Sequence, residues 1–293
     1  MRDKHTSDSF RRFVDDLTAS IGWVESLGLK VVPGRFGDYE RLYEAIPNAP
    51  NEEWFPLALA GLEAGQELSL IRRHLGHLDP IELKRRLHSY VSGPGLQRSE
   101  NPSSGSTQPR DIGFELVLGA QLSAAGLRVQ LGRHWDLEIE GERKINLECK
   151  RPQSVEKLEA AFRKAANQLV ERATLVAEDP PTGIVAISIG RIVHGGAKFL
   201  PTPDLGSAIG VLDATTSGFV RSHDMLWQST RYAAVHAVLI DLSTPVHVTS
   251  TNQWLWGHFD VLRPVNNNPS QLAATDIGLV AAALTRRQGL TRF

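Results

Sequence analysis

The 293-residue sequence predicts a mixed α/β protein, with a small helical domain first and a three-layer α/β/α core after it. Three observations lead to this prediction. Before residue 92, apolar residues recur at the three- and four-residue steps of amphipathic helices. Residues 93–110 are rich in Ser, Gly, Pro and Asn, which is typical of a flexible linker. After residue 110, helix-like and strand-like segments alternate.

Residues 1–92 are therefore expected to form a mostly helical N-terminal domain. The pattern is clear in 52–76 and again in 80–91, where Pro80 stands at a position that the first turn of a helix tolerates. The first 37 residues give no firm indication. This domain is expected to sense, to dimerise or to bind an unknown partner.

Residues 111–293 are expected to form one domain with a mixed central sheet. A first helix should run from Asp111, a suitable N-cap, to Gly126, a suitable stop. The "GER" segment between two alternating runs predicts a hairpin. The remaining expected elements, in order, are a strand over 127–132, hairpin strands over 134–140 and 144–150, a helix over 154–173, a buried strand over 182–190, a helix over 222–234 and a strand over 234–243.

Composition limits the possible classes of protein. The net charge is −1, so no overall basic character points to nucleic acid, although a local basic groove is compatible with it. The only cysteine, Cys149, excludes an internal disulfide and fits a reducing cytoplasm. The polar N-terminus lacks the apolar core of a signal peptide. No apolar run approaches the roughly 18–20 residues that span a bilayer, so no membrane association is expected.

The hairpin concentrates charged residues on one face. Because side chains alternate along a strand, Glu148 and Lys150 share a face, and Asp136 of the neighbouring strand lies near them. Carboxylate oxygens are ligands for Mg²⁺, and a nearby lysine can orient a water or stabilise charge on a phosphate. A solvated face of the hairpin would explain the same charges without any chemistry.

Residues 111–190 resemble the core of the PD-(D/E)xK, or restriction-endonuclease-like, nuclease superfamily. In that family a helix with a glutamate precedes a hairpin that holds an aspartate and then Glu-x-Lys, and a helix with a polar residue follows. The matching residues here, in order, are Glu115, Asp136, Glu148, Lys150 and Gln168. Trp135 stands where the family motif has proline, a departure that the family widely tolerates.

The resemblance implies roles for the hairpin residues. Asp136 and Glu148 would ligate Mg²⁺, with Mn²⁺ as a substitute, together with the backbone carbonyl of Cys149. Lys150 would act on the attacking water. Phosphodiester hydrolysis would follow, because a bound metal polarises the phosphate and lowers the pKa of a bound water.

Other residues have an implied role and an equally ordinary alternative. Glu115 would bind a second metal or act in the outer shell, or else it is an exposed glutamate favoured by the helix dipole. Gln168 would contact water or phosphate, or else it faces solvent. Arg151, Arg163 and Lys164 are candidates for contacts to the nucleic-acid backbone, or else they belong to a solvated helix face.

Other motifs give weaker indications. The Cys149 side chain points to the apolar face of its strand and is expected to be a buried, unreactive thiol. His74 and His77 lie three residues apart, but no second pair follows, so a zinc site is not expected. The aromatic segment 251–261 is expected to pack in the core or at a subunit interface. Phosphate-loop and dinucleotide-loop motifs are absent from the sequence.

The sequence therefore predicts a cytoplasmic, Mg²⁺-dependent DNA endonuclease. One active site per chain suggests a homodimer, because cutting a duplex requires two sites. Two alternatives stay open: an RNA-directed nuclease of the same fold, and a non-catalytic nucleic-acid-binding or scaffold protein that retains the fold.

Overall fold

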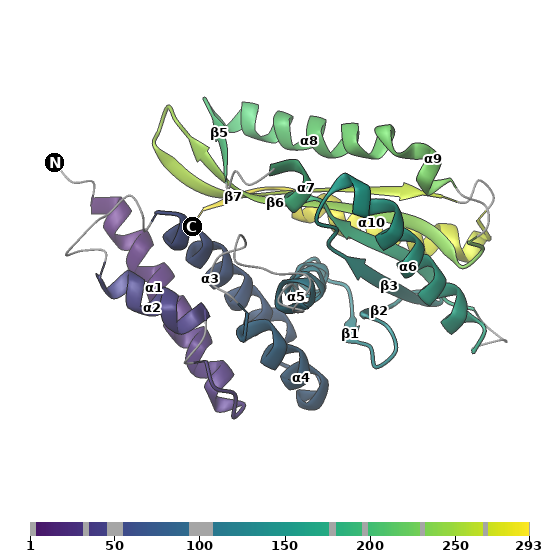
Figure 1. Cartoon of the computed structure of the whole chain (residues 1–293), viewed down its shortest axis with the longest axis horizontal. Helices are drawn as coiled ribbons and strands as arrows, with labels where there is room; N and C mark the ends of the chain where they lie inside the picture. Colours follow the sequence, from purple (N-terminus) through teal and green to yellow (C-terminus); the bar gives the residue numbers. More distant parts are fainter. Residues whose placement is uncertain are drawn as a thin grey trace. The chain divides into compact units, whose positions relative to one another are not determined.

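The structure, a computed structural model, describes residues 4–31, 35–45, 55–93, 108–175, 180–194, 199–228, 232–265 and 269–292. The chain divides into two compact units (Figure 1). Unit 1 is Met1–Ala120 with Arg292–Phe293, and unit 2 is Gln121–Thr291. The boundary falls within a helix that begins at Gln108, so residues 108–110 of the expected linker are helical and Asp111 lies in the first turn, not at the N-cap. Most of the expected linker lies outside the described residues.

Unit 1 is helical. Its helices are α1 (Lys4–Ser26), α2 (Arg35–Ala45), α3 (Phe55–Leu75), α4 (Pro80–Val91) and most of α5 (Gln108–Ala124). Helices α1, α2 and α3 pack against one another. The Asp79 side chain caps α4 by accepting a hydrogen bond from the Ile81 amide at 2.9 Å, and Pro80 occupies the first turn as expected. A helix also forms in the first 37 residues, for which no element was predicted.

Unit 2 is built around a mixed sheet, which confirms the mixed α/β class. The strands are β1 (Val129–Leu131), β2 (Leu137–Glu140), β3 (Lys144–Lys150), β4 (Thr182–Ser188), β5 (Leu200–Thr202), β6 (Val235–Val248), β7 (Gln253–Pro264) and β8 (Gly289–Arg292). They follow the order β1-β2-β3-β4-β6-β7-β8, and β5 pairs with β6. Strand β3 is antiparallel to β2 and parallel to β4, and β6 is parallel to β4 and antiparallel to β7.

Helices cover both faces of this sheet. The helices of unit 2 are α6 (Val155–Ala173), α7 (Gly190–His194), α8 (Leu205–Ser222), α9 (Asp224–Trp227) and α10 (Gln271–Arg287). Helices α6 and α8 pack on the face that carries Val185 and Ile187 (Figure 1). Helix α10 packs on the other face, where Asp276 accepts a hydrogen bond from Thr182 at 2.7 Å. Burial of the apolar stripe of α6 drives its docking, since each fully buried Leu or Phe contributes about 1.5–3 kcal/mol.

Asp276 also fixes the turn of the β2–β3 hairpin. One of its oxygens accepts a hydrogen bond from the Glu142 amide at 2.9 Å, inside the predicted "GER" turn. A Cβ atom on Gly141 would collide with the same carboxylate, so only glycine fits there. The turn thus sets the register of the two strands that position the candidate site.

One predicted element is wrong. A helix was expected over 222–234, but the long helix α8 ends at Ser222, the described residues of this range form only the short α9, and strand β6 begins at Val235. The sequence of α8 contains several Gly, Ser and Thr residues, which have low helix propensity and obscure its pattern. The helix is stabilised by tertiary burial of Ala208, Leu212, Thr216 and Val220, which recur at four-residue steps.

Candidate active site

The β2–β3 hairpin brings Asp136 beside Glu148 and Lys150. Leu137 pairs with Leu147 in the antiparallel register, so Asp136, just before β2, lies opposite Glu148. The Asp136 carboxylate accepts a hydrogen bond from the backbone amide of Cys149 at 2.7 Å. The three polar side chains predicted from the alternation of the strands therefore lie together.

The polar face of β3 is buried at this end. Glu148 is 0% exposed and Asn146 is 1% exposed, because α6 packs over this face of the strand. A solvated hairpin face is thus the wrong explanation for Glu148. A solvated face describes the hairpin only nearer the turn, where exposed Lys144 pairs with Glu138 at 2.9 Å. Burying a carboxylate is costly unless opposite charges compensate it, so Glu148 requires partners.

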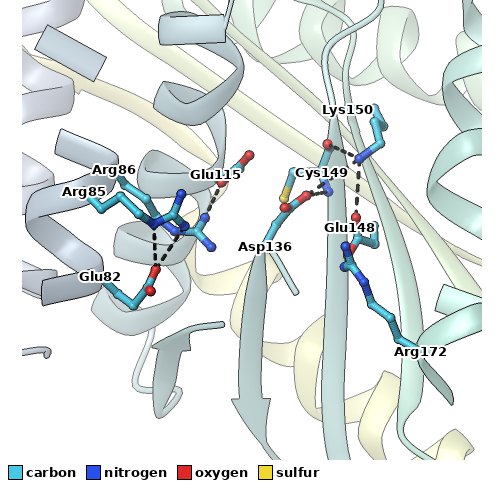
Figure 2. A network of polar contacts seen from close by, with 9 residues as sticks. All are labelled: Glu82, Arg85, Arg86, Glu115, Asp136, Glu148, Cys149, Lys150 and Arg172. Atoms are coloured by element: carbon cyan, nitrogen blue, oxygen red, sulfur yellow. Dashed lines mark hydrogen bonds and ion pairs between the residues drawn. The ribbon is translucent and has the colours of Figure 1, made fainter. Parts of the chain in front are cut away.

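Three oxygen atoms surround the ammonium group of Lys150 (Figure 2). Lys150 Nζ lies 3.0 Å from the Cys149 carbonyl oxygen, 3.4 Å from Glu148 Oε2 and 3.8 Å from Asp136 Oδ2. These are the three groups expected to ligate Mg²⁺. Two carboxylates and one carbonyl converging on one cationic atom match the all-oxygen ligand set of a hard divalent cation, so the residues present fit Mg²⁺ or Mn²⁺.

Arg172 belongs to the candidate site and was missed by the sequence reasoning. It extends from the last turn of α6 and forms an ion pair with the second oxygen of Glu148 (Figure 2). Its guanidinium lies 5.5 Å from the ring centroid of Trp135, in a cation–π contact. Trp135, at the position of the motif proline, therefore supports the side chain that neutralises Glu148. Helical spacing could have predicted Arg172, because it lies four residues after Gln168 and therefore on the same stripe of the helix.

The surroundings raise the pKa of Glu148 to about 7. Burial is the largest cause, because it disfavours the charged form, and the negative charge of Asp136 adds to it. The positive charges of Lys150 and Arg172 oppose the shift without cancelling it. A metal ion between the two carboxylates would favour the ionised form of Glu148 further.

The predicted residues of α6 lie at different depths. Gln168 is half-buried, and its Oε1 atom has no hydrogen-bond partner among the described residues, so it is a spare acceptor one turn from Arg172. Lys164 is exposed one turn further toward the N-terminus. Arg163 is exposed and forms an ion pair with Glu159, which agrees with the alternative that it belongs to a solvated helix face. Arg151 follows β3 and is half-buried.

Glu115 belongs to unit 1 and has its own partner there. It lies on α5 and forms an ion pair with Arg86 of α4, which is almost fully buried (Figure 2). Arg85, the neighbour of Arg86, pairs with Glu82 at 3.0 Å. Within unit 1, Glu115 thus contributes to the packing of α5 on α4. Its predicted metal-binding role stays a prediction.

A second polar cluster was also missed by the sequence reasoning. Asp241 of β6 and His258 and Asp260 of β7 are all buried, and one potential ligand atom from each lies within 4.8 Å of the others. The residues are 17 and 19 positions apart from Asp241 in the chain, so only the register of the long β6–β7 hairpin brings them together.

Comparison of the chain with protein-family models, with curated proteins and with solved structures finds no match. In the part of the chain that the structure describes, no helix has the length and apolar character needed to cross a membrane. The case for a function therefore depends on the geometry of the site.

Proposed function

We propose that the protein is a metal-dependent nuclease with a restriction-endonuclease-like core in unit 2. The observation that supports it best is the convergence of Asp136 Oδ2, Glu148 Oε2 and the Cys149 carbonyl on the ammonium of Lys150 within 3.8 Å. A lysine beside two carboxylates, of which Glu148 is fully buried and Asp136 is half-buried, can support metal-assisted phosphodiester hydrolysis. A purely structural hairpin has no need to bury Glu148 at this cost.

A bound Mg²⁺ would supply polarisation of the phosphate and a water of lowered pKa. The protein residues would do the rest. Asp136 is held in place by the Cys149 amide and Glu148 by Arg172, so both carboxylates are oriented before any cation enters. Lys150 would leave the oxygens to the metal and turn its ammonium toward the attacking water or the charge on the phosphate. Water adds to phosphorus, the bond to one sugar oxygen breaks, and a phosphate monoester and a hydroxyl result.

The substrate is proposed to be nucleic acid, with DNA favoured over RNA. Lys164, Gln168 and Arg172 follow one another at four-residue steps along α6, from exposed to partly buried, and offer two cations and one amide to a phosphate backbone. Arg151 and Arg163 extend this set. Glu115 as an additional metal ligand, a homodimer, a partner for the helical N-terminal part and a cytoplasmic location belong to the same proposal.

The test is cleavage of supercoiled plasmid, single-stranded DNA and RNA by the purified full chain with Mg²⁺, Mn²⁺ or EDTA. Metal-dependent cleavage is expected in the wild type and is expected to be lost in Lys150→Ala. Lys144→Ala is the matched control, because Lys144 lies on the same strand but is exposed and pairs with Glu138. Cleavage confined to RNA would favour the RNA-directed alternative. Binding of nucleic acid with no cleavage in any metal would favour the scaffold alternative and refute the nuclease.

A further inference from the structure

The second cluster occupies the opposite face of the sheet from the candidate active site. Glu148 and Lys150 are in register with Val185 and Ile187, on the face that α6 covers. Asp241 is in register with Ser188, and because neighbouring side chains alternate, it points to the other face. Along the β6–β7 hairpin, Asp241 pairs with Asp260 and Ser243 pairs with His258, so all four side chains share that face.

The cluster is buried and built around one imidazole. The exposed fractions are 2% for Asp241, 5% for His258 and 3% for Asp260. On one side of the ring, His258 Nε2 lies 2.8 Å from Asp260 Oδ2. On the other side, His258 Nδ1 lies 2.6 Å from Ser243 Oγ, 3.5 Å from Asp241 Oδ1 and 3.5 Å from the side-chain amide of Gln121.

The two sides of the ring have different chemical roles. A metal-ligating histidine almost always donates its other ring N–H to a carboxylate or carbonyl, which fixes the tautomer. The contact between His258 Nε2 and Asp260 is such an arrangement, and it directs the lone pair of Nδ1 toward Asp241 and Ser243. A half-turn of the Gln121 amide would present its oxygen to the same point, since the two orientations of an amide are nearly isosteric.

The spacing of these donors matches a coordination shell. Neighbouring ligands of a cation with bonds of about 2.0–2.2 Å lie about 3.0–3.5 Å apart. His258 Nδ1 and Asp241 Oδ1 are 3.5 Å apart, and Ser243 Oγ and Asp241 Oδ1 are 3.3 Å apart. Ser243 Oγ and His258 Nδ1 are closer, at 2.6 Å, in a hydrogen bond that would have to open for both atoms to ligate an ion. The imidazole ligand favours zinc and similar transition metals over Mg²⁺, which prefers oxygen alone.

We propose that His258 Nδ1 and Asp241 Oδ1, with Ser243 and Gln121, bind a divalent transition metal of the zinc type, oriented by Asp260. The ion would connect β6, β7 and the end of α5, and two carboxylates would match its charge. The site is structural and does not depend on the nuclease proposal. Ser243, His258 and Asp260 also resemble a nucleophile, base and orienting carboxylate, but burial of the imidazole favours an ion over a reacting substrate.

The experiment is equilibrium dialysis of the metal-stripped full chain against Zn²⁺, with the absorption spectrum of the Co²⁺-loaded protein as a second readout. At least one Zn²⁺ is expected to remain bound in the wild type, and one in Asp136→Asn, which disables the proposed Mg²⁺ site on the other face. His258→Gln is expected to lose it. His247→Gln is the matched control, because His247 lies on the same hairpin but contacts the exposed Asn252 at 2.9 Å.

Asp260→Asn keeps every proposed ligand and is expected to weaken Zn²⁺ binding by about 10–100-fold while leaving the circular dichroism spectrum unchanged. It therefore tests the site even if His258→Gln fails to fold. Absence of bound Zn²⁺ in the wild type, or equal binding by the wild type and Asp260→Asn, would overturn the proposal. Labelling of Ser243 by a fluorophosphonate without metal binding would overturn it in favour of the nucleophile arrangement.

Discussion

The two faces of the central sheet hold two carboxylate pairs that are compensated differently. In one pair one carboxylate is buried and the other half-buried, and in the other pair both are buried. On the α6 face, Asp136 and Glu148 are compensated by the ammonium of Lys150 and the guanidinium of Arg172. On the other face, Asp241 and Asp260 flank the imidazole of His258. Both pairs lie in the same sheet, a few strands apart.

The difference suggests two kinds of cation site. A flexible lysine can leave its oxygens when a metal and a phosphate arrive, so the Asp136–Glu148 pair suits an exchangeable Mg²⁺ and a reaction. An imidazole fixed by a carboxylate cannot leave, so the Asp241–His258 pair suits an ion that stays bound and supports the fold. The predictions below test whether the first site behaves as an exchangeable one.

The largest effect is expected from Lys150→Met on cleavage. Removing the ammonium takes away charge stabilisation at the phosphate, so the cleavage rate should fall by about 100–1,000-fold. The measurement is single-turnover cleavage with saturating Mg²⁺, beside Lys144→Met. An unchanged cleavage rate in Lys150→Met would mean that this lysine has no role in the reaction and only compensates the carboxylates when no metal is bound.

The next effect is a pH dependence of stability that Glu148 causes. Its folded pKa of about 7 lies above the unfolded value of 4.5, so the stability that protonation contributes is complete below pH 4.5 and is lost as pH rises through about 7. The loss is on the order of 3 kcal/mol across that window. Urea unfolding of metal-free wild type and Glu148→Gln should show their stability difference shifting in favour of the variant between pH 5 and pH 8. A stability difference between wild type and Glu148→Gln that does not change with pH would contradict a raised pKa for the buried Glu148 carboxylate.

Arg172→Met should have a smaller effect. The variant removes one of the two cations beside Glu148 and should lower the free energy of unfolding by about 1–2 kcal/mol at pH 8, less than for a fully buried pair because the guanidinium keeps contact with solvent. Added Mg²⁺ should recover part of the loss, since both cations act on the same carboxylate. Arg163→Met is the control, with an exposed pair on the same helix and an expected change below about 0.5 kcal/mol. Equal losses of unfolding free energy in Arg172→Met and Arg163→Met would show that Arg172 does not stabilise the Glu148 carboxylate.

The smallest effect should come from Trp135→Phe. The indole gives the stronger cation–π contact, so the variant should lose about 0.5–1 kcal/mol of stability. In the Arg172→Met background most of this loss should disappear, which a double-mutant cycle of urea unfolding measures. Full additivity of the two changes would show that Trp135 acts through packing alone.

The sequence was sufficient for the hairpin and its charges, and the physical reason is locality. Strand alternation and one short turn determine where Asp136, Glu148 and Lys150 lie, so their meeting can be predicted without tertiary information. The mixed α/β class follows from the same periodicities. The contact between Arg172 and Glu148 could not be predicted from the hairpin alone, because it also depends on the rotation of α6 about its axis where it packs on the sheet.

The rest depends on contacts between distant segments. His258 sits in an aromatic segment that predicted core packing, and its partner Asp241 follows an apolar run that predicted only a buried strand. A zinc site was not expected because spacing rules detect ligands that lie close in sequence, and this hairpin joins strands of 14 and 12 residues. Burial of the polar face of β3 was likewise hidden, since the strand pattern does not show which helix covers it.

The most direct test of the central claim is Mn²⁺ binding to the Asp136–Glu148 site, measured by electron paramagnetic resonance of free Mn²⁺ at pH 8 with the transition-metal site filled by Zn²⁺. The account predicts that the wild type and the matched control Glu138→Gln bind Mn²⁺ alike, and that Asp136→Asn binds it at least about tenfold more weakly. Equal binding by wild type and Asp136→Asn, or none by either, would contradict a cation site between these carboxylates.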